Sequence, residues 1–209
     1  MTASEVEAEP AAAAQLFGDR LDLARQYTAD LAARGEELGL IGPLELPRLW
    51  TRHVLNCALL SPLVEGRVGD VGSGAGLPGL VLAIARPDVE FVLIEPMERR
   101  VDWLRSESAA LGLGNVEVLR ARAEEARFSP WLDQVTARAV SALGKLIPIT
   151  APLVRSGGTL LFLKGASVQA EVDGAAKAIK KARLSEVEIL LLGEGLLPEV
   201  TRVFRATVD

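Results

Sequence analysis

The chain has 209 residues, of which 49% are hydrophobic and 24% are charged, a composition typical of one globular domain and not of a disordered or fibrous protein. Its formal net charge is −5, but residues 1–40 contain eight acidic residues and three arginines and account for all of it. The remainder of the chain is balanced, so the acidic total does not exclude a polyanionic partner.

The N-terminal third is predicted to be helical after a short tail. Residues 1–12 are rich in alanine and glutamate and are expected to form a flexible acidic tail. Residues 13–64 are expected to form a helical extension, because apolar residues recur with helical spacing between residues 15 and 38, at Leu16, Leu23, Tyr27 and Leu31. The pair Gly42-Pro43 breaks the pattern, and Pro47 is expected to begin a helix that runs to about residue 63.

From residue 65 to residue 209, apolar strands alternate with helices. Helices are expected at 78–86, 97–111 and 168–182, and strands at 68–71, 89–95, 116–119, 134–137, 159–164, 187–192 and 201–207. This alternation predicts an α/β, Rossmann-like fold with a mostly parallel seven-stranded sheet and helices on both faces. The last two strands have no helix between them and are expected to form an antiparallel pair at one edge.

A glycine-rich loop follows the first predicted strand and can be read in two registers. Gly74, Gly76 and Gly79 have the G-x-G-x-x-G spacing of dinucleotide-binding folds. Asp70, Gly72, Gly74 and Gly76 instead have the spacing of the loop in S-adenosylmethionine (SAM) methyltransferases. Charge favours the second register, because Asp70 would repel a pyrophosphate but would attract the ammonium and sulfonium groups of SAM. Tight turns and close helix packing are the structural alternative, above all for Gly79.

Glu95 closes the second predicted strand, 23 residues after Gly72. In either nucleotide-binding interpretation, an acid at this position accepts hydrogen bonds from ribose hydroxyls. A solvated acid at the strand end is the alternative.

Three sequence blocks together resemble the RsmG (GidB) family of bacterial 16S rRNA guanine-N7 methyltransferases. They are R-H-V-L-N at 52–56, D-V-G-S-G-A-G-L-P-G at 70–79, and the downstream pair R-A at 138–139 and L-K-G at 163–165. The similarity runs from about residue 15 to the end of the chain. This chain departs from the family in having Asn56 where Asp is usual and Glu95-Pro96 where Asp-Ser is common.

The resemblance implies a class I SAM-dependent methyltransferase fold with SAM as the cofactor and 16S rRNA or the small ribosomal subunit as the partner. Carried over to this sequence, the family's cofactor contacts fall on Gly72, Leu77, Ala123, Glu124 and Arg138. With the loop and the ribose acid, the expected cofactor-binding set is Asp70, Gly72, Gly74, Gly76, Leu77, Glu95, Ala123, Glu124 and Arg138.

The expected chemistry requires no catalytic acid–base residue. Guanine N7 has a lone pair at neutral pH and can attack the SAM methyl group without losing a proton, so catalysis depends on positioning. The chain has one histidine and one cysteine, and no cluster of a zinc-binding type, so no metal is expected.

The expected RNA-facing residues are Arg52, His53, Arg99, Arg100, Lys164 and Arg202. Lys164 ends a strand, where it could reach a phosphate or the guanine O6. A solvated helix face is the alternative for Arg99 and Arg100, and a packed, hydrogen-bonded side chain is the alternative for His53.

Three other functions stay open at this point: a SAM enzyme acting on a small molecule or protein, an NAD-dependent oxidoreductase, and an RNA-binding scaffold without activity. Cys57 stands alone, the first residues do not resemble a signal peptide, and no apolar stretch reaches the roughly 20 residues of a membrane span. We therefore expect a monomeric, cytoplasmic protein that does not contact a membrane.

Overall fold

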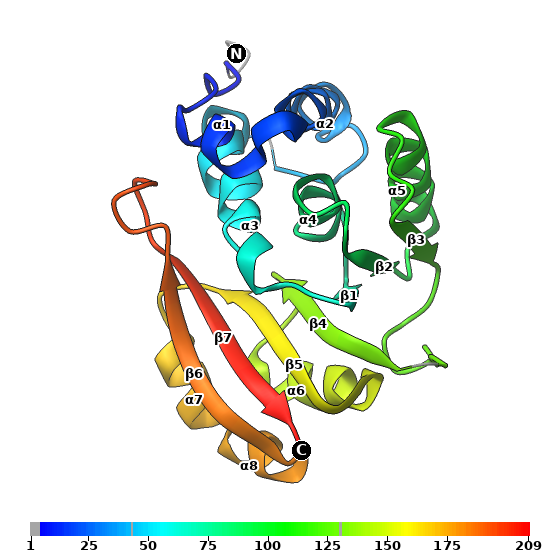
Figure 1. The fold of residues 1–209 in the computed structure, drawn as a ribbon, viewed down its shortest axis with the longest axis vertical. Coiled ribbons are helices and arrows are strands. Elements are labelled where there is room, and N and C mark those ends of the chain that lie inside the picture. The colour runs from blue at the N-terminus through cyan, green and yellow to red at the C-terminus, as the bar shows by residue number, and fades with distance from the viewer. Residues whose placement is uncertain (1–4, 43, 130) are drawn as a thin grey trace.

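The structure, a computed structural model, describes residues 5–42, 44–129 and 131–209. Its centre is a seven-stranded sheet with the order β3-β2-β1-β4-β5-β7-β6 (Figure 1). The strands are β1 (Arg67–Val71), β2 (Glu90–Ile94), β3 (Val116–Leu119), β4 (Leu132–Arg138), β5 (Val154–Lys164), β6 (Leu184–Leu192) and β7 (Thr201–Val208). The first five strands pair in parallel, whereas β7 is antiparallel to both β5 and β6. The predicted mostly parallel sheet and its antiparallel edge are thus confirmed.

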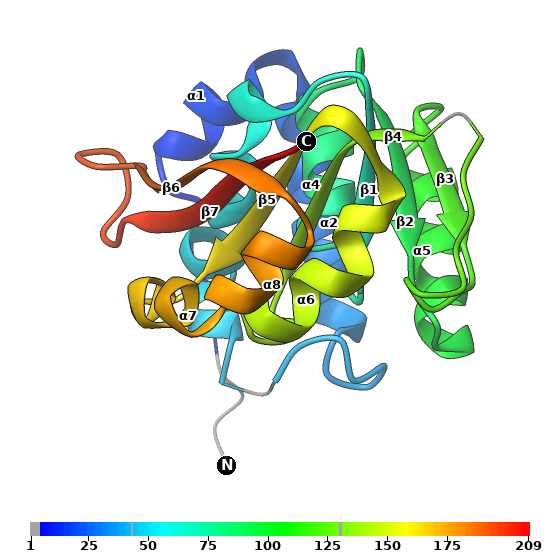
Figure 2. The ribbon, with the colours of Figure 1, turned by 90° about the horizontal axis from the view of Figure 1, so that it is seen from below.

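Helices cover both faces of the sheet, as predicted (Figures 1 and 2). One face carries α1 (Ala12–Phe17), α2 (Leu21–Arg34), α3 (Asn56–Ala58), α4 (Gly79–Ala85) and α5 (Glu98–Ala110), and the other carries α6 (Leu143–Thr150), α7 (Val168–Gly174) and α8 (Ala176–Lys181). Successive side chains of β5 point to opposite faces. Leu161 and Leu163 accordingly belong to the core under α1–α5, and Leu160 and Phe162 to the core under α6–α8.

The N-terminal helices share the first of these cores with the sheet. Tyr27 and Leu31 of α2 are fully buried in it beside Leu80 of α4. The helix expected from Pro47 to about residue 63 is instead a series of short segments, which include a π-helix over Leu49–Leu55. Wider helical turns of this kind occur at functional sites, and this one carries Arg52 and His53.

The expected acidic tail is held against the helices over part of its length. The Glu7 amide donates to the Leu46 carbonyl (2.9 Å), the Glu7 carboxylate accepts from the Thr51 amide (2.9 Å), and Glu9 pairs with Arg25 (2.6 Å). These contacts place residues 7–9 against the helices, and the flexibility of residues 1–12 stays a prediction. Residues 1–4 of that tail, and Pro43 of the expected break, lie outside the described residues.

Two helical features differ from the prediction. Helix α6 lies between β4 and β5, where no helix was predicted, and it contains Pro148. Its buried residues Leu143, Leu146, Ile147 and Thr150 have the spacing of one helix face, which is the signal that the proline obscures. The single helix predicted over 168–182 is divided at Ala175 into α7 and α8, directly after Gly174.

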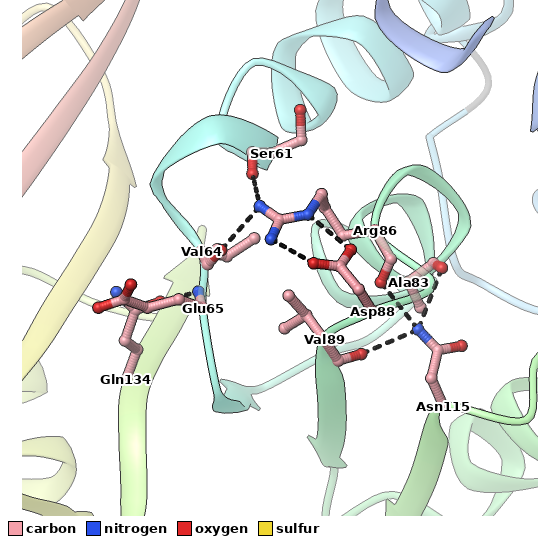
Figure 3. A network of polar contacts seen from close by, with 9 residues as sticks. All are labelled: Ser61, Val64, Glu65, Ala83, Arg86, Asp88, Val89, Asn115 and Gln134. Atoms are coloured by element: carbon pink, nitrogen blue, oxygen red, sulfur yellow. Dashed lines mark hydrogen bonds and ion pairs between the residues drawn. The ribbon is translucent and has the colours of Figure 1, made fainter.

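A polar network ties the helical layer to the amino ends of the strands (Figure 3). Arg86, at the end of α4, donates to the carbonyls of Ser61 (2.6 Å) and Val64 (2.8 Å). The Asn115 amide donates to the carbonyls of Ala83, Arg86 and Val89 at 3.0–3.2 Å. These bonds satisfy the final carbonyls of α4 at the edge of the sheet opposite the glycine loop.

Candidate active site

The glycine loop lies at the carboxyl edge of the sheet, between β1 and α4. The Gly72 amide donates to the Ile94 carbonyl (2.8 Å), and this bond joins the loop to the end of β2. Two side chains donate to the Ala75 carbonyl from the helical layer: the Tyr27 hydroxyl (3.1 Å) and the Trp103 indole N–H (2.9 Å). The loop is therefore fixed from the sheet and from α2 and α5, which leaves its other side for a ligand.

Two glycines of the loop serve different purposes. Gly76 has φ +96°, and a Cβ there would collide with Leu80 of α4, so this glycine is required by packing. Gly74 has φ +54°, and the nearest atom to a Cβ there would be the Gly72 carbonyl oxygen at 3.8 Å. The backbone at Gly74 thus borders open space and can be approached closely by a bound molecule.

Asp70 lies beneath the loop and is not among the described residues that line the two cavities beside Arg138. Its side chain is fully buried, and Oδ2 accepts a hydrogen bond from the Gly79 amide at the start of α4 (2.9 Å). Oδ1 has no hydrogen-bond partner in the described part of the chain, and burial raises the pKa of this carboxyl to about 7. Asp70 thus supports the turn from β1 into α4, a role that the charge argument from sequence did not include.

Glu95 also supports the loop. It is 2% exposed, its Oε2 accepts from the Gly74 amide (2.9 Å) and its Oε1 accepts from the Met97 amide (3.0 Å). The acid at the end of β2 therefore fixes the open glycine of the loop. Its hydrogen bonds to ribose stay a prediction.

The loop forms one wall of a cavity of about 320 Å³. The cavity is also lined by Leu77, Glu45, His53, Arg100 and Arg138, and by the loop residues Ser73, Gly74 and Ala75. Of the expected cofactor contacts, Gly74, Leu77 and Arg138 meet here. Gly72 and Gly76 lie in the loop behind this wall, while Ala123 and Glu124 lie in the turn after β3, farther along the same carboxyl edge.

Arg100, which was expected to face RNA, lies at this cavity beside the glycine loop. It lines the cavity from the first turn of α5, and its Nε is buried without a hydrogen-bond partner among the described residues. Its neighbour Arg99 points elsewhere and lines a separate groove with Arg34 and Trp103, between α2 and α5. The structure therefore separates two arginines that the sequence grouped together.

Arg138 ends β4 and lines a second, larger cavity of about 690 Å³ as well. One guanidinium nitrogen lies 3.4 Å from the Cys57 sulfur and the other lies 2.7 Å from His53 Nδ1. His53 Nε2 in turn lies 2.6 Å from a Glu45 carboxylate oxygen. His53 is 9% exposed with both ring nitrogens engaged, so the packed, hydrogen-bonded alternative describes it.

The larger cavity collects most of the other basic residues that were expected to face RNA. Arg52, Lys164 and Arg202 line it together with Arg138, and two acids, Glu171 and Glu199, line it too. Lys164 is already engaged, because its ammonium pairs with Glu171 (2.7 Å) and donates to the Ser141 carbonyl (2.9 Å). Arg52 is half exposed, and its Nε lies 3.6 Å from a Glu45 carboxylate oxygen.

Sequence reasoning missed Glu45, Tyr27, Trp103 and Cys57 as parts of the site. Glu45 lies seven residues before Arg52, in a segment for which no motif was recognised. Tyr27 was considered only as one of the apolar residues at helical spacing, and Trp103 was not considered; for both, a buried polar tip that needs a partner was the available signal. Among residues 5–42, 44–129 and 131–209, no group of three or more His, Cys, Asp or Glu side chains is arranged to hold a metal. Over the same ranges, no helix is long and apolar enough to cross a membrane.

Comparison with solved structures places the fold. The chain superposes on the N-methyltransferase NodS from Bradyrhizobium japonicum WM9 in complex with S-adenosyl-L-homocysteine, with a TM-score of 0.58 and 16% identity, over 85% of this chain and 97% of that one. A SAM-dependent O-methyltransferase from Thermotoga maritima gives a TM-score of 0.57 at 16% identity, over 74% of this chain and 65% of that one. The chain therefore has the fold of the class I SAM-dependent methyltransferases, with its glycine loop at the carboxyl edge.

Sequence comparison then gives the family. A family profile described as rRNA small subunit methyltransferase G (GidB) matches residues 20–197, so the chain belongs to this family and the resemblance seen in the sequence is confirmed. The chain is 69% identical over 204 residues to "Ribosomal RNA small subunit methyltransferase G" of Leifsonia xyli subsp. xyli, covering 97% of this chain and 98% of the relative. The protein of that name from Clavibacter michiganensis subsp. michiganensis is 64% identical, with 97% of each chain covered.

Proposed function

We propose that this protein transfers the methyl group of SAM to N7 of a guanine in the 16S RNA of the small ribosomal subunit, acting as a cytoplasmic monomer. The single observation that carries the proposal is the position of Arg138. It lines both the cavity at the glycine loop and the larger cavity bordered by basic residues, so a cofactor and an RNA base can meet beside it.

The residues of the smaller cavity fit SAM. The open backbone at Gly74 suits a closely bound ligand, and Arg100 offers a guanidinium whose Nε lacks a partner within the described residues. A guanidinium is suited to a carboxylate, and the amino-acid end of SAM has one. When bound, SAM supplies an electrophilic methyl group on a positively charged sulfur.

The reaction is a single displacement that needs no proton transfer. A bond forms between guanine N7 and the methyl carbon as the sulfur–carbon bond breaks, and the positive charge passes from sulfur to the purine. The protein therefore has to align the two reactants and exclude competing nucleophiles. Asp70 and Glu95 hold the loop, and the Arg138 guanidinium fixes the border between the two cavities.

RNA is favoured over a small molecule or a protein as the acceptor because of the larger cavity. Arg52, Arg138 and Arg202 border it, and guanidinium groups are suited to phosphate oxygens and to the O6 atom of guanine, which leaves the N7 lone pair free to react. A small apolar acceptor would form no ion pair or hydrogen bond with these guanidinium groups.

A methyl-transfer assay tests the proposal. Small subunits and naked 16S rRNA from a strain that lacks the homologous gene are incubated with the purified protein and SAM labelled in its methyl group. We expect one methyl group per RNA, located by nuclease mapping and mass spectrometry as 7-methylguanine, and none on wild-type subunits. Methylation of another atom, or none on either substrate, would refute it.

A further inference from the structure

A continuous line of side chains connects Glu45, His53 and Arg138. The Glu45 carboxylate lies 2.6 Å from Nε2 of His53, and Nδ1 of the same ring lies 2.7 Å from a guanidinium nitrogen of Arg138. Glu45 and Arg138 lie 93 positions apart in the sequence. Among the described residues, His53 joins them through its two ring nitrogens.

The chemistry of the two neighbours fixes the proton on His53. A guanidinium has only donors, so Nδ1 of His53 must be the acceptor and cannot carry a proton. The remaining proton of the neutral ring is then on Nε2, where it is donated to Glu45. A doubly protonated ring would place an N–H of His53 against an N–H of the guanidinium, and the hydrogen bond between His53 and Arg138 would be lost.

The surroundings of His53 favour the same neutral form. Burial lowers the pKa of His53 to about 4, and the nearby charges of Arg138 and Arg52 act in the same direction, while Glu45 opposes them. Cys57, whose thiol pKa burial raises, contacts the other side of the Arg138 guanidinium. Burial and the two arginine charges therefore favour the neutral ring.

The guanidinium of Arg138 is held in place by protein contacts and still has N–H donors for a ligand. One of its N–H groups contacts Cys57 and another contacts His53, and the Arg138 side chain lines both cavities. A guanidinium has five N–H groups, so these two contacts do not exhaust its donors. A long side chain loses much conformational entropy when it is fixed in one conformation. Hydrogen bonds that already hold the Arg138 side chain before a ligand binds reduce the entropy that is lost on binding.

We propose that His53 is a positioning residue, which as the neutral Nε2–H tautomer links Glu45 to Arg138 and holds the Arg138 guanidinium between the cofactor and the target guanine. This role rests on the proposed function, because it concerns the alignment of those two reactants. His53 lines the smaller cavity, and its proposed role is exerted through the Arg138 guanidinium.

Nitrogen-15 NMR tests the link without any activity measurement. The chain has one histidine, so the imidazole signals need no assignment. In the wild-type protein we expect the Nε2–H tautomer and no titration between pH 8 and pH 5.5. In R138M the His53 ring should titrate at higher pH than in the wild type. R48Q is the control, because it removes only the contact of Arg48 with the other Glu45 oxygen, and the pH at which His53 titrates should be the same as in the wild type. An Nδ1–H tautomer, or a wild-type titration near pH 6.5, would overturn the proposal.

Turnover on small subunits tests the positioning. H53F places an aromatic ring there without either nitrogen, and we expect kcat to fall about tenfold with KM for the subunit nearly unchanged, measured below the melting temperature of the variant. H53Q restores one acceptor and one donor and should recover most of the loss. Unchanged kcat in H53F, or a loss that H53Q does not rescue, would overturn the role in turnover.

The two tests separate this inference from the proposed function. If the wild-type protein does not methylate small subunits, the proposed function fails, and the NMR result still decides whether the link exists. If H53F does not fold, the inference is tested by the tautomer of His53 in the wild-type protein and by the change in His53 titration between the wild type and R138M.

Discussion

Arg100 is the residue whose position gives the sharpest test of the cofactor cavity. It lines that cavity from α5, and its buried Nε has no partner in the described chain. We expect R100M, which keeps the length of the side chain, to weaken SAM binding about tenfold in calorimetry, because a charged hydrogen bond to the ligand carboxylate is lost.

R105M is the matched control for this prediction. Arg105 lies on the same helix but is exposed and lines neither cavity of the site. Its replacement should leave SAM affinity within about twofold of the wild type. Equal affinities in R100M and the wild type would show that Arg100 does not contact the ligand.

Single residues also show where sequence reasoning stops. The loop spacing identified Gly74 as a candidate, and the strand-end position identified Glu95, because both signals are local in the chain. The contact of His53 with Arg138 spans 85 positions, and its role depends on which ring nitrogen faces the guanidinium. Neither fact has a local signal. For the same reason Arg99 and Arg100 were grouped, although adjacent helical residues point in directions that differ by about 100°.

At the level of elements, α2 and α5 meet around a buried acid. Glu107 of α5 is 2% exposed, and its Oε1 has no hydrogen-bond partner among the described side chains and backbone groups. Burial raises the pKa of Glu107 from its ordinary value of 4.5 to about 7, Asp30 raises it further, and Arg34 opposes the shift. The folded protein therefore binds the Glu107 proton more tightly than the unfolded chain does.

This raised pKa fixes the sign of a pH effect on stability. The contribution of protonated Glu107 is fully present below about pH 4.5 and is lost as the pH rises through about 7. E107Q keeps the shape without the charge, so it should be more stable than the wild type at pH 8, by about 2 kcal/mol in the free energy of unfolding. The difference should disappear at pH 4.5, as measured by urea unfolding at both pH values. A constant difference would contradict the assignment.

Elements were predicted from sequence where their pattern was regular. The apolar run of β2 and the helical spacing of α5 gave bounds close to those observed, and the absence of a helix between the last two strands gave the antiparallel edge. Helix α6 was missed because Pro148 lies inside it. A single helix was predicted over 168–182, but the chain forms two helices there, and the first of them ends at Gly174. The irregular helical segments over 46–63 follow from tertiary packing, which a periodic pattern does not record.

At the scale of the whole molecule, the negative charge and the proposed RNA site are in different places. The excess of acidic residues lies in residues 1–40, while the larger cavity is bordered by Arg52, Arg138, Lys164 and Arg202. Lys164 is neutralised by Glu171, and Glu199 adds a further negative charge to the border. Few uncompensated cations remain, so we expect RNA binding to depend on shape and assembly more than on net charge.

The salt dependence of RNA binding tests this distribution of charge. With about two or three phosphate contacts, the logarithm of the affinity for a 16S rRNA fragment should fall with the logarithm of the salt concentration with a slope near −2. R202A removes one cation at the start of β7 and should reduce the size of that slope by about one unit, with SAM affinity unchanged. R155A is the control, because Arg155 lies at the end of β5 opposite to Lys164 and the larger cavity, where it pairs with Asp133 (2.7 Å). A slope much steeper than −4, or an equal effect of both variants, would mean that RNA is bound over a surface well beyond the larger cavity.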